Sequence, residues 1–551
     1  MLMKIIRTTL LLIQFVITGA GSKAQVFTNP ILAGYYPDPS ICRAGDDFYL
    51  INSSFAFYPG IPIFHSKDLL NWKQIGYALD RPEQLDLEGH GVSRGLFAPS
   101  ITYHKGTFYI VCTQVDKVGN FVITAKDPKG PWTNPVSIPE VNGIDPSLFF
   151  DDSKTYVVYN SIPPDNKPLH NGHRTIRLRE FDAASLKVTG EEKILVNGGT
   201  DITKKPVWIE APHIIKKDAW FYLVCAEGGT GYNHSEVIFR SKSVEGPYIS
   251  HEKNPILTQR HLDTLRKHPI TTTGHADFVE GKDGKWWAVF LGCRPYEGDF
   301  YNTGRETFMA PVEWKDGWLQ FNLGGDEVKY SYPINATIDK NAEKFSGNYL
   351  FRDEFNTANL NVRYNFLRTV KEKWYSLSGG ALTINVRPET CGGRSNPSFI
   401  GFHQPHLKGY AATSMHFTAA NENEKAGLLI FQNEKTHYFL CQAMKDGKQE
   451  VQLYKGAELI SSKPISVSKE GLQLKIEAKN DKYAFWYAEK KGNWQLLMDN
   501  ADGKYLSTKV AGGFVGSLYT MYATSNGNPS TNKAVYDWFE CKNDDDVYKN
   551  K

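Results

Sequence analysis

Asp38-Pro-Ser-Ile-Cys-Arg-Ala-Gly-Asp-Asp-Phe-Tyr49 is the first of five similar stretches in the first three hundred residues of the chain. Each begins with a short step that starts at Asp or Ala. A run of β-forming residues, a polar turn and a closing aromatic residue follow. Two apolar runs around a turn of Gly, Asp or Lys are typical of a β-hairpin, so one hairpin is predicted to repeat five times. The other copies are Ala98-Pro-Ser-Ile-Thr-Tyr-His-Lys-Gly-Thr-Phe-Tyr109, Asp145-Pro-Ser-Leu-Phe-Phe-Asp-Asp-Ser-Lys-Thr-Tyr156, Ala211-Pro-His-Ile-Ile-Lys-Lys-Asp-Ala-Trp-Phe-Tyr222 and Ala276-Asp-Phe-Val-Glu-Gly-Lys-Asp-Gly-Lys-Trp-Trp287.

The spacing of these copies predicts a propeller. They start at 38, 98, 145, 211 and 276, which is 47 to 66 residues apart and suits a four-stranded blade with its loops. Beyond residue 347 the repeat gives way to alternating strands such as 381–386 and 472–477, which favour a two-sheet sandwich. The predicted fold is all-β, with a five-bladed β-propeller over residues 25–335 and a C-terminal β-sandwich over residues 347–551.

Residues 1–24 are predicted to be an export signal. Lys4 and Arg7 precede an apolar run, and Ser22-Lys-Ala24 offers small residues for cleavage after Ala24. The run is too short to cross a membrane, and no other long apolar run follows it. The mature protein is therefore expected to be periplasmic or secreted, without a membrane span.

Composition excludes several classes of partner. The 63 basic and 60 acidic residues give a net charge of +3 without a basic stripe, so no nucleic-acid partner is expected. The seven cysteines are odd in number and lack CxxC spacing, which favours buried free thiols over a metal or redox site. The sequence leaves the oligomeric state open.

Three acidic residues lie at, or next to, the first position of the repeat. Asp38 and Asp145 occupy the step itself, and Glu210 precedes the aligned Ala211 by one residue. Radial repetition brings equivalent positions to one end of the central channel, so the three carboxyl groups are expected to share one pit. An isolated Asp-Pro is more often a turn than a catalyst, and Ala98 shows that the fold needs no acid there. A shared pit, however, suits hydrolysis of a glycosidic bond by one protonated and one ionised carboxyl group.

Five motifs follow one another along the chain: Tyr36-Pro-Asp38-Pro-Ser, Gly143-Ile-Asp145-Pro-Ser-Leu, Ile209-Glu210-Ala-Pro-His, Gly274-His275-Ala and Gly292-Cys-Arg294-Pro. Taken together, they resemble glycoside hydrolase family 43. The resemblance extends from about Asn29 to the end of the chain, and it is closest to the β-xylosidase and α-L-arabinofuranosidase branch with a C-terminal concanavalin-like jelly roll. It implies a five-bladed propeller that releases xylose or arabinose by an inverting mechanism.

The resemblance also implies roles for these residues. Asp38 would be the general base, Glu210 the general acid, and Asp145 the residue that tunes and orients the acid. Arg294 would bind substrate hydroxyls or hold a carboxylate, with a structural ion pair as the alternative. His275 would lie near the propeller axis, either as a substrate ligand or as a hydrogen-bonded core residue.

Four further residues carry expectations from the same resemblance. Phe514 would close the pocket from the sandwich, and Phe97 stands where many relatives have Trp, which reduces the stacking surface there. Asp353 and Asp537 match positions that hold a structural calcium in related sandwiches. No cofactor is required for the chemistry itself.

The expected activity is an exo-acting glycosidase that removes terminal α-L-arabinofuranosyl groups from hemicellulose oligosaccharides. Three alternatives remain open. They are β-D-xylosidase as the main activity, a carbohydrate-binding protein without catalysis, and a retaining invertase-type hydrolase, although the Tyr-Pro-Asp-Pro-Ser step departs from that last group.

Two segments are expected to be irregular. Residues 55–62 are apolar but interrupted by Pro and Gly, which predicts a loop with aromatic side chains beside the acids or a packed turn. The acidic end from Asn543 onward is expected to fray.

Overall fold

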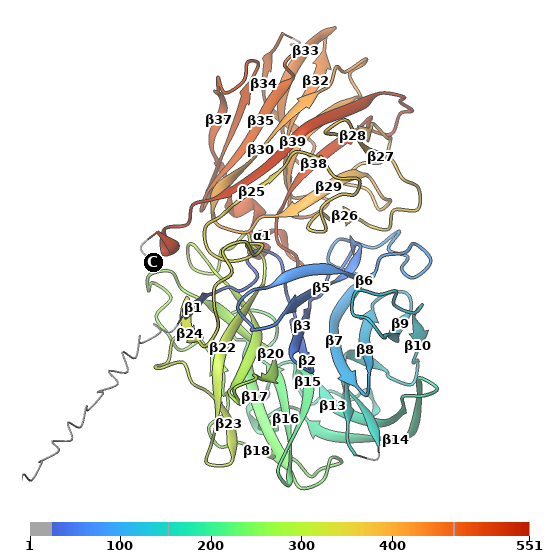
Figure 1. Cartoon of the computed structure of the whole chain (residues 1–551), viewed down its shortest axis with the longest axis vertical. Coiled ribbons are helices and arrows are strands. Elements are labelled where there is room, and N and C mark those ends of the chain that lie inside the picture. Colours follow the sequence, from blue (N-terminus) through green and yellow to red (C-terminus); the bar gives the residue numbers. More distant parts are fainter. Residues whose placement is uncertain (1–24, 153, 467–468, 550–551) are drawn as a thin grey trace, which may run out of the picture.

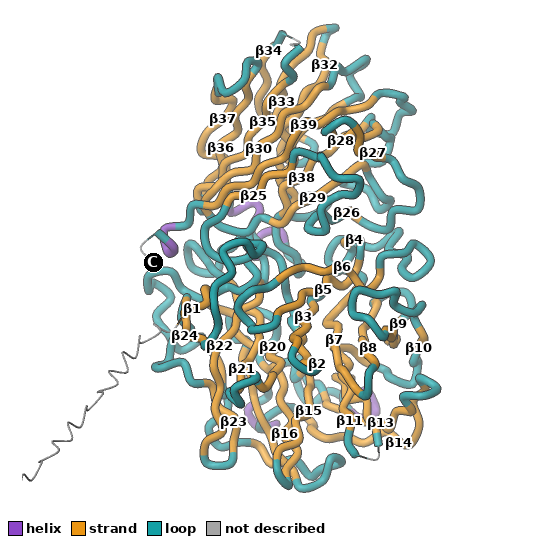
Figure 2. The backbone as a smooth tube through the Cα atoms, in the orientation of Figure 1, coloured by secondary structure: helices purple, strands orange, loops and turns teal. Residues whose placement is uncertain are grey.

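The computed structural model describes residues 25–152, 154–466 and 469–549. The export signal expected over residues 1–24 lies outside this part of the chain. Two bodies are stacked along the long axis, with the N-terminal half below and the C-terminal half above (Figure 1). Strands dominate both bodies (Figure 2), so the all-β class is confirmed.

The described part of the lower body contains five antiparallel sheets of four or five strands, one for each copy of the hairpin. Their first two strands are the two halves of that hairpin. The sheets are β2 (Ser40–Ala44), β3 (Asp47–Ile51), β5 (Gly60–Ser66) and β6 (Lys73–Leu79); β7 (Leu96–His104), β8 (Thr107–Gln114), β9 (Gly119–Ala125) and β10 (Val136–Ser137); β11 (Gly143–Phe150), β12 (Thr155–Ser161), β13 (Thr175–Asp182) and β14 (Lys187–Asn197); β15 (Glu210–Lys217), β16 (Trp220–Glu227), β17 (Ser235–Ser241), β18 (Ile249–Ser250) and β19 (Leu257–Thr258); and β20 (Thr271–Glu280), β21 (Trp286–Cys293), β22 (Glu306–Lys315) and β23 (Trp318–Phe321).

The first strands of the five sheets form a closed ring. β2 contacts β7, β7 contacts β11, β11 contacts β15, β15 contacts β20, and β20 returns to β2. A two-stranded sheet of β1 (Gln25–Thr28) and β24 (Ser331–Ile334) joins the two ends of this body. The ring places the start of every hairpin at the same central position.

The backbone conformation is also repeated at the start of every hairpin. Near the start of each sheet, one residue of the hairpin step has the left-handed conformation that residues other than Gly rarely adopt. In four of the five sheets the strand pairing shifts by a bulge that includes this residue. A bulge redirects the side chains beside it. The local backbone thus turns these side chains together; their φ angles are 51° at Asp38, 34° at Ala98, 54° at Asp145, 49° at Ala211 and 55° at His275.

The upper body is built from two antiparallel sheets that enclose an apolar core. One sheet contains β25 (Leu350–Asp353), β27 (Tyr375–Ser378), β28 (Ala381–Asn385), β30 (Lys408–His416), β35 (Leu472–Lys479), β36 (Lys482–Ala488), β37 (Gln495–Asp502) and β39 (Lys533–Asn543). The other contains β29 (Ser398–His403), β31 (Lys425–Phe431), β32 (His437–Lys445), β33 (Lys448–Lys455), β34 (Glu458–Pro464) and β38 (Leu518–Thr524). Helices are short: α1 (Thr508–Ala511) and the 3-10 turns Pro164–Asn166, Ile202–Lys204, Lys504–Leu506 and Asp546–Tyr548.

The two bodies share a hydrophobic core. β4 (Phe57–Tyr58) of the lower body pairs with β26 (Phe366–Leu367) of the upper one. Buried side chains such as Leu96 and Ile400 belong to one continuous apolar cluster. The expected loop at 55–62 is thus largely strand, because β4 and β5 take most of it and the partner strand lies three hundred residues away.

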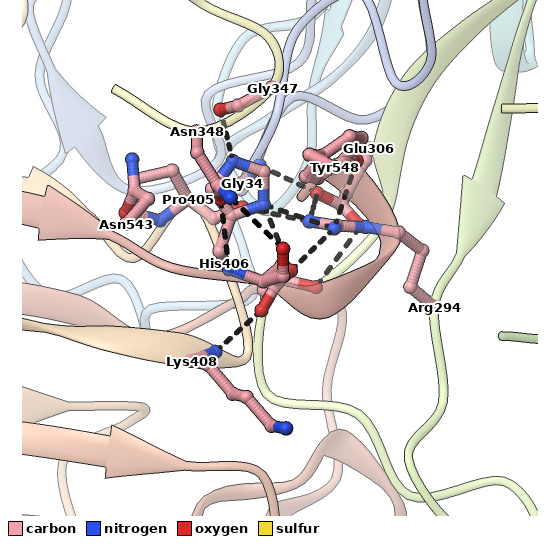
Figure 3. Close-up of polar contacts among 12 residues, drawn as sticks. Gly34, Arg294, Glu306, Gly347, Asn348, Pro405, His406, Lys408, Asn543 and Tyr548 are labelled. Carbon is pink, nitrogen blue, oxygen red and sulfur yellow. Dashed lines mark hydrogen bonds and ion pairs between the residues drawn. The ribbon is translucent and has the colours of Figure 1, made fainter. Parts of the chain in front are cut away.

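A polar cluster locks the C-terminus onto this junction (Figure 3). Arg294 donates to both oxygens of Glu306 at 2.7 Å and to Asp545 Oδ2 at 3.0 Å. His406 Nδ1 lies 3.1 Å from the same Asp545 oxygen, and Tyr548 donates to the carbonyl of Asn29 at 2.9 Å. The expectation that the acidic end frays is therefore wrong for Asp545, which is buried and hydrogen-bonded.

Removal of the Asp545 carboxylate should destabilise the joined bodies. Asp545→Ala leaves Arg294 and His406 with one buried partner fewer, and breaking a buried ion pair costs about 3 kcal/mol. The midpoint of urea unfolding should therefore be lower than that of the wild type. Asp546→Ala removes only exposed ion pairs, with Lys408 and Lys549, and should change the midpoint little, so equal stability of both variants would contradict the prediction.

All seven cysteines are buried and free, as the sequence predicted. Burial raises the pKa of thiols such as Cys225. Among the described residues, helices that combine the length and apolar character of a membrane span are absent.

Candidate active site

The predicted acids meet in one pocket of about 410 Å³. Asp38, Asp145 and Glu210 line it together, and all three are between 4 and 7% exposed. They come from the first, third and fourth sheets of the ring, at or just before the strands β2, β11 and β15. The left-handed backbone at Asp38 and Asp145 and the bulges after residues 144 and 210 direct these side chains to a common centre.

Asp38 is held in the ionised form. Burial by itself would raise its pKa, but Arg305 forms an ion pair with Oδ1 and the Ser53 hydroxyl donates to Oδ2 at 2.7 Å. These contacts lower the pKa of Asp38 below the ordinary aspartate value. The carboxylate can therefore accept a proton from water.

Glu210 is in the opposite situation. Burial, together with the negative charges of Asp145 and Asp38, raises the pKa of Glu210 well above the ordinary value. Its nearest donor is the Thr230 hydroxyl, at 3.4 Å from Oε1. Burial and the Asp38 charge also raise the pKa of Asp145, although the Ala211 amide donates to its Oδ2 at 3.2 Å. Asp145 and Glu210 are thus the carboxyl groups that hold a proton in this pocket, whereas Asp38 is ionised.

Two neutral histidines lie beside the acids. His275 lines the pocket with Nδ1 3.8 Å from Asp38 Oδ1, and burial lowers its pKa to about 4. His234 Nδ1 lies 3.2 Å from the carbonyl of Thr272, so this nitrogen carries the proton and Nε2 faces Glu210 at 4.0 Å. Burial lowers the pKa of His234 to about 3. Neither imidazole adds positive charge near neutral pH.

The aromatic residues expected at the pocket are present. Phe97 and Phe514 both line it, and their ring centroids are 5.9 Å apart. Phe55 completes this aromatic trio at 4.8 Å from Phe97 and 6.0 Å from Phe514. Phe514 reaches the pocket from the upper body and is 38% exposed, so it stands at the rim.

Arg294, expected to bind substrate, is not among the residues that line this pocket. Its guanidinium is fully buried at the junction of the bodies, where Glu306, Asp545 and the carbonyl of Pro405 accept its hydrogen bonds (Figure 3). The ion-pair alternative describes it correctly. Arg305, for which no sequence pattern had indicated a role, is instead the arginine that lines the pocket and pairs with Asp38.

Asp353 and Asp537 do not by themselves fit a calcium site. Asp353 Oδ1 accepts from the amide of Phe355 at 2.8 Å, whereas Asp537 Oδ2 accepts from Ser414 at 2.7 Å and faces His416 at 3.1 Å. Calcium takes six to eight oxygen ligands. Across the described residues, no group of three or more His, Cys, Asp or Glu gathers as a metal cluster would.

Comparison with known proteins agrees with this geometry. The family model described as "Glycosyl hydrolases family 43" matches residues 27–319, and the "Beta xylosidase C-terminal Concanavalin A-like domain" matches residues 352–542. The chain belongs to glycoside hydrolase family 43. It is a glycosidase with a propeller catalytic body and a concanavalin-like second body.

Relatives match this family 43 enzyme over nearly its whole length. A xylosidase/arabinosidase of Butyrivibrio fibrisolvens is 39% identical, covering 93% of this chain and 99% of the relative. A non-reducing end α-L-arabinofuranosidase of Bacteroides ovatus is 35% identical over 97% and 98%. The crystal structure of a GH43_12 protein retrieved from a capybara gut metagenome superimposes with a TM-score of 0.85, 40% identity and coverage of 91% and 96%.

The role of Asp145 can be tested through the pH profile. Its charge helps to keep Glu210 protonated, so Asp145→Asn should lower the pKa of Glu210. The alkaline limb of kcat/KM should then move to lower pH by about one unit. Asp151→Asn alters a partner of Lys216 in the turn after β11, away from the pocket, and should leave both limbs in place. An unchanged alkaline limb in Asp145→Asn would exclude the tuning role.

Proposed function

We propose that the protein is an exo-acting, inverting glycosidase that releases non-reducing terminal α-L-arabinofuranosyl groups from hemicellulose oligosaccharides. The observation that carries this proposal is the opposite pKa shift of Asp38 and Glu210 within one pocket. Asp38 activates water as the general base, and Glu210 protonates the oxygen of the leaving group. Asp145 maintains the raised pKa of Glu210.

The position of the acids in the ring favours inversion. We infer that the five sheets are five propeller blades, in which β2 and β15 are not neighbours. Base and acid thus approach a bound sugar from different sides, as a water attack opposite the leaving group requires. The aromatic trio of Phe55, Phe97 and Phe514 closes the pocket beside Asp38, which favours access by a terminal sugar only.

Two sugars compete for the pocket. Phe97 in place of a larger ring reshapes the wall and favours the furanose, as does the name of the Bacteroides ovatus relative. The Butyrivibrio fibrisolvens relative carries both activities in its name, so β-D-xylosyl release is the second candidate. The signal expected over residues 1–24 favours action outside the cytoplasm.

The test uses 4-nitrophenyl α-L-arabinofuranoside and 4-nitrophenyl β-D-xylopyranoside, with the anomer of the first product followed by proton NMR. We expect turnover of the arabinofuranoside, with inversion at the anomeric carbon. Faster turnover of the xyloside would favour the second candidate. A retained anomer would overturn the assignment of Asp38 as a base, and sugar binding without turnover would support a lectin instead.

A further inference from the structure

The two sides of the acid pocket differ in chemistry. Around Asp38 lie the aromatic trio and Arg305, whose Cζ is 5.7 Å from the rings of both Phe55 and Phe514. Around Glu210 lie Thr230, Gly229 and Trp208, which also line the pocket. If Glu210 protonates the leaving oxygen, as proposed above, the sugar that leaves must lie on this second side.

Trp208 is held at the pocket by a strained backbone. It stands two residues before Glu210 and has a φ of 51°, a left-handed conformation that residues other than Gly rarely adopt. Its amide donates to the carbonyl of Gly172 at 2.8 Å, and the carbonyl of Val207 accepts from Gly228 at 2.8 Å. These two bonds tie the residue between the loop before β13 and the glycine-rich loop after β16.

Arg174 braces the indole from behind. Its Cζ lies 3.9 Å from the centroid of the Trp208 ring, within the range of a cation–π contact. Its Nε is buried without a hydrogen-bond partner, and no ion pair to a carboxylate forms among the described residues. Burial lowers the pKa of Arg174, and Glu210 is the group whose charge opposes this shift.

Arg174 is partly desolvated but has no carboxylate partner in the described part of the chain, so a structural ion pair does not explain its position. Its guanidinium instead lies over the Trp208 ring and so holds the indole on the Glu210 side of the pocket. The Thr230 hydroxyl lines the same side of the pocket as this ring. An aromatic ring beside a polar group is suited to a pyranose, whose C–H face is apolar and whose edge carries hydroxyl groups.

We propose that Trp208 is the specificity-determining residue for the leaving group, and that it binds the neutral pyranose ring of the sugar chain from which the terminal sugar is cut. Arg174 is the positioning residue that holds the indole. This inference rests on the proposed function, because Glu210 defines the side on which the leaving group lies.

The experiment distinguishes the Asp38 side of the pocket, here called the terminal-sugar half, from the Glu210 side, where the leaving group lies. The kcat/KM for an oligosaccharide that the wild type cleaves depends on contacts in both halves. The inhibition constant of the released monosaccharide depends only on the terminal-sugar half. Trp208→Ala should lower kcat/KM about tenfold or more, because a lost apolar contact of this size is worth about 1.5–3 kcal/mol and 1.4 kcal/mol is a factor of ten. The inhibition constant should stay within about twofold.

Arg174→Met should lower kcat/KM for the oligosaccharide about threefold to tenfold, since it removes the cation–π contact that positions the Trp208 ring but keeps the ring itself. Lys242→Met is the matched control, because Lys242 Nζ lies 3.7 Å from the Trp220 ring outside the pocket. It should leave both constants unchanged. Should Trp208→Ala fail to fold, Trp208→Leu keeps an apolar side chain and takes its place.

Three results would overturn the inference. Unchanged kcat/KM in the Trp208 variant would remove the residue from substrate binding. A rise in the monosaccharide inhibition constant equal to the loss in kcat/KM would place Trp208 in the terminal-sugar half. An effect of Lys242→Met as large as that of Arg174→Met would make the brace a general stability effect. Absence of cleavage by the wild type, in contrast, would overturn the proposed function first.

Discussion

Asp38→Asn is expected to lower kcat by about 10²- to 10⁴-fold on every substrate that the wild type cleaves. The asparagine keeps the size of the side chain but cannot accept a proton from water, so the attack loses its base whatever the leaving group is. The loss should be equal for aryl glycosides and for oligosaccharides. Steady-state rates on one substrate of each kind would check it.

The variant must still be folded for this result to count. Asp38→Asn removes the carboxylate partner of the buried Arg305, and an unpaired buried charge costs about 3 kcal/mol, so a lower unfolding midpoint is expected too. Circular dichroism below that midpoint should match the wild type. Asp47→Asn, which affects an outer pair with His65 in the same sheet, is the control and should keep full activity. A wild-type rate in Asp38→Asn would remove Asp38 from the mechanism.

Glu210→Gln should show a loss that depends on the leaving group. A sugar alkoxide leaves slowly without a proton, so cleavage of oligosaccharides should fall about 10²- to 10⁴-fold. Dinitrophenolate leaves without protonation, and the dinitrophenyl glycoside should lose far less activity. The ratio of the two rates, measured in the same buffer, distinguishes a proton donor from a base.

Loss of the alkaline limb should accompany this change. Because Glu210 is active when protonated and its pKa is raised, the wild-type kcat/KM should fall only above the ordinary glutamate range. On the dinitrophenyl substrate, Glu210→Gln should keep its rate through that pH range. Glu227→Gln alters a half-buried carboxyl group that accepts from Thr200 and lies outside the pocket lining, and it serves as the control. Equal losses on both substrates would exclude Glu210 as the acid.

The repeat made much of the fold predictable. The five hairpins, the all-β class, the second body and the buried thiols follow from patterns that lie within short stretches of chain. The shared pocket of Asp38, Asp145 and Glu210 was predictable as well, because a repeated unit places equivalent residues at equivalent points. Ala98 at the same slot showed that the acids are not required by the fold.

Contacts between segments that are distant in the sequence became visible only in the tertiary structure. Arg294 and Arg305 look alike in sequence, yet one pairs with the C-terminal Asp545 and the other with Asp38. The strand at Phe57 exists because residue 367 pairs with it.

Local pattern determined the repeat and the slot of the acids, since hairpin geometry is encoded by neighbouring residues. Only the folded structure determined three other features. They are the charge state of each acid, the contact of Arg174 with Trp208 and the burial of Asp545 near the chain end. Long-range packing alone sets which charges and rings meet, and a single sequence carries no record of those contacts.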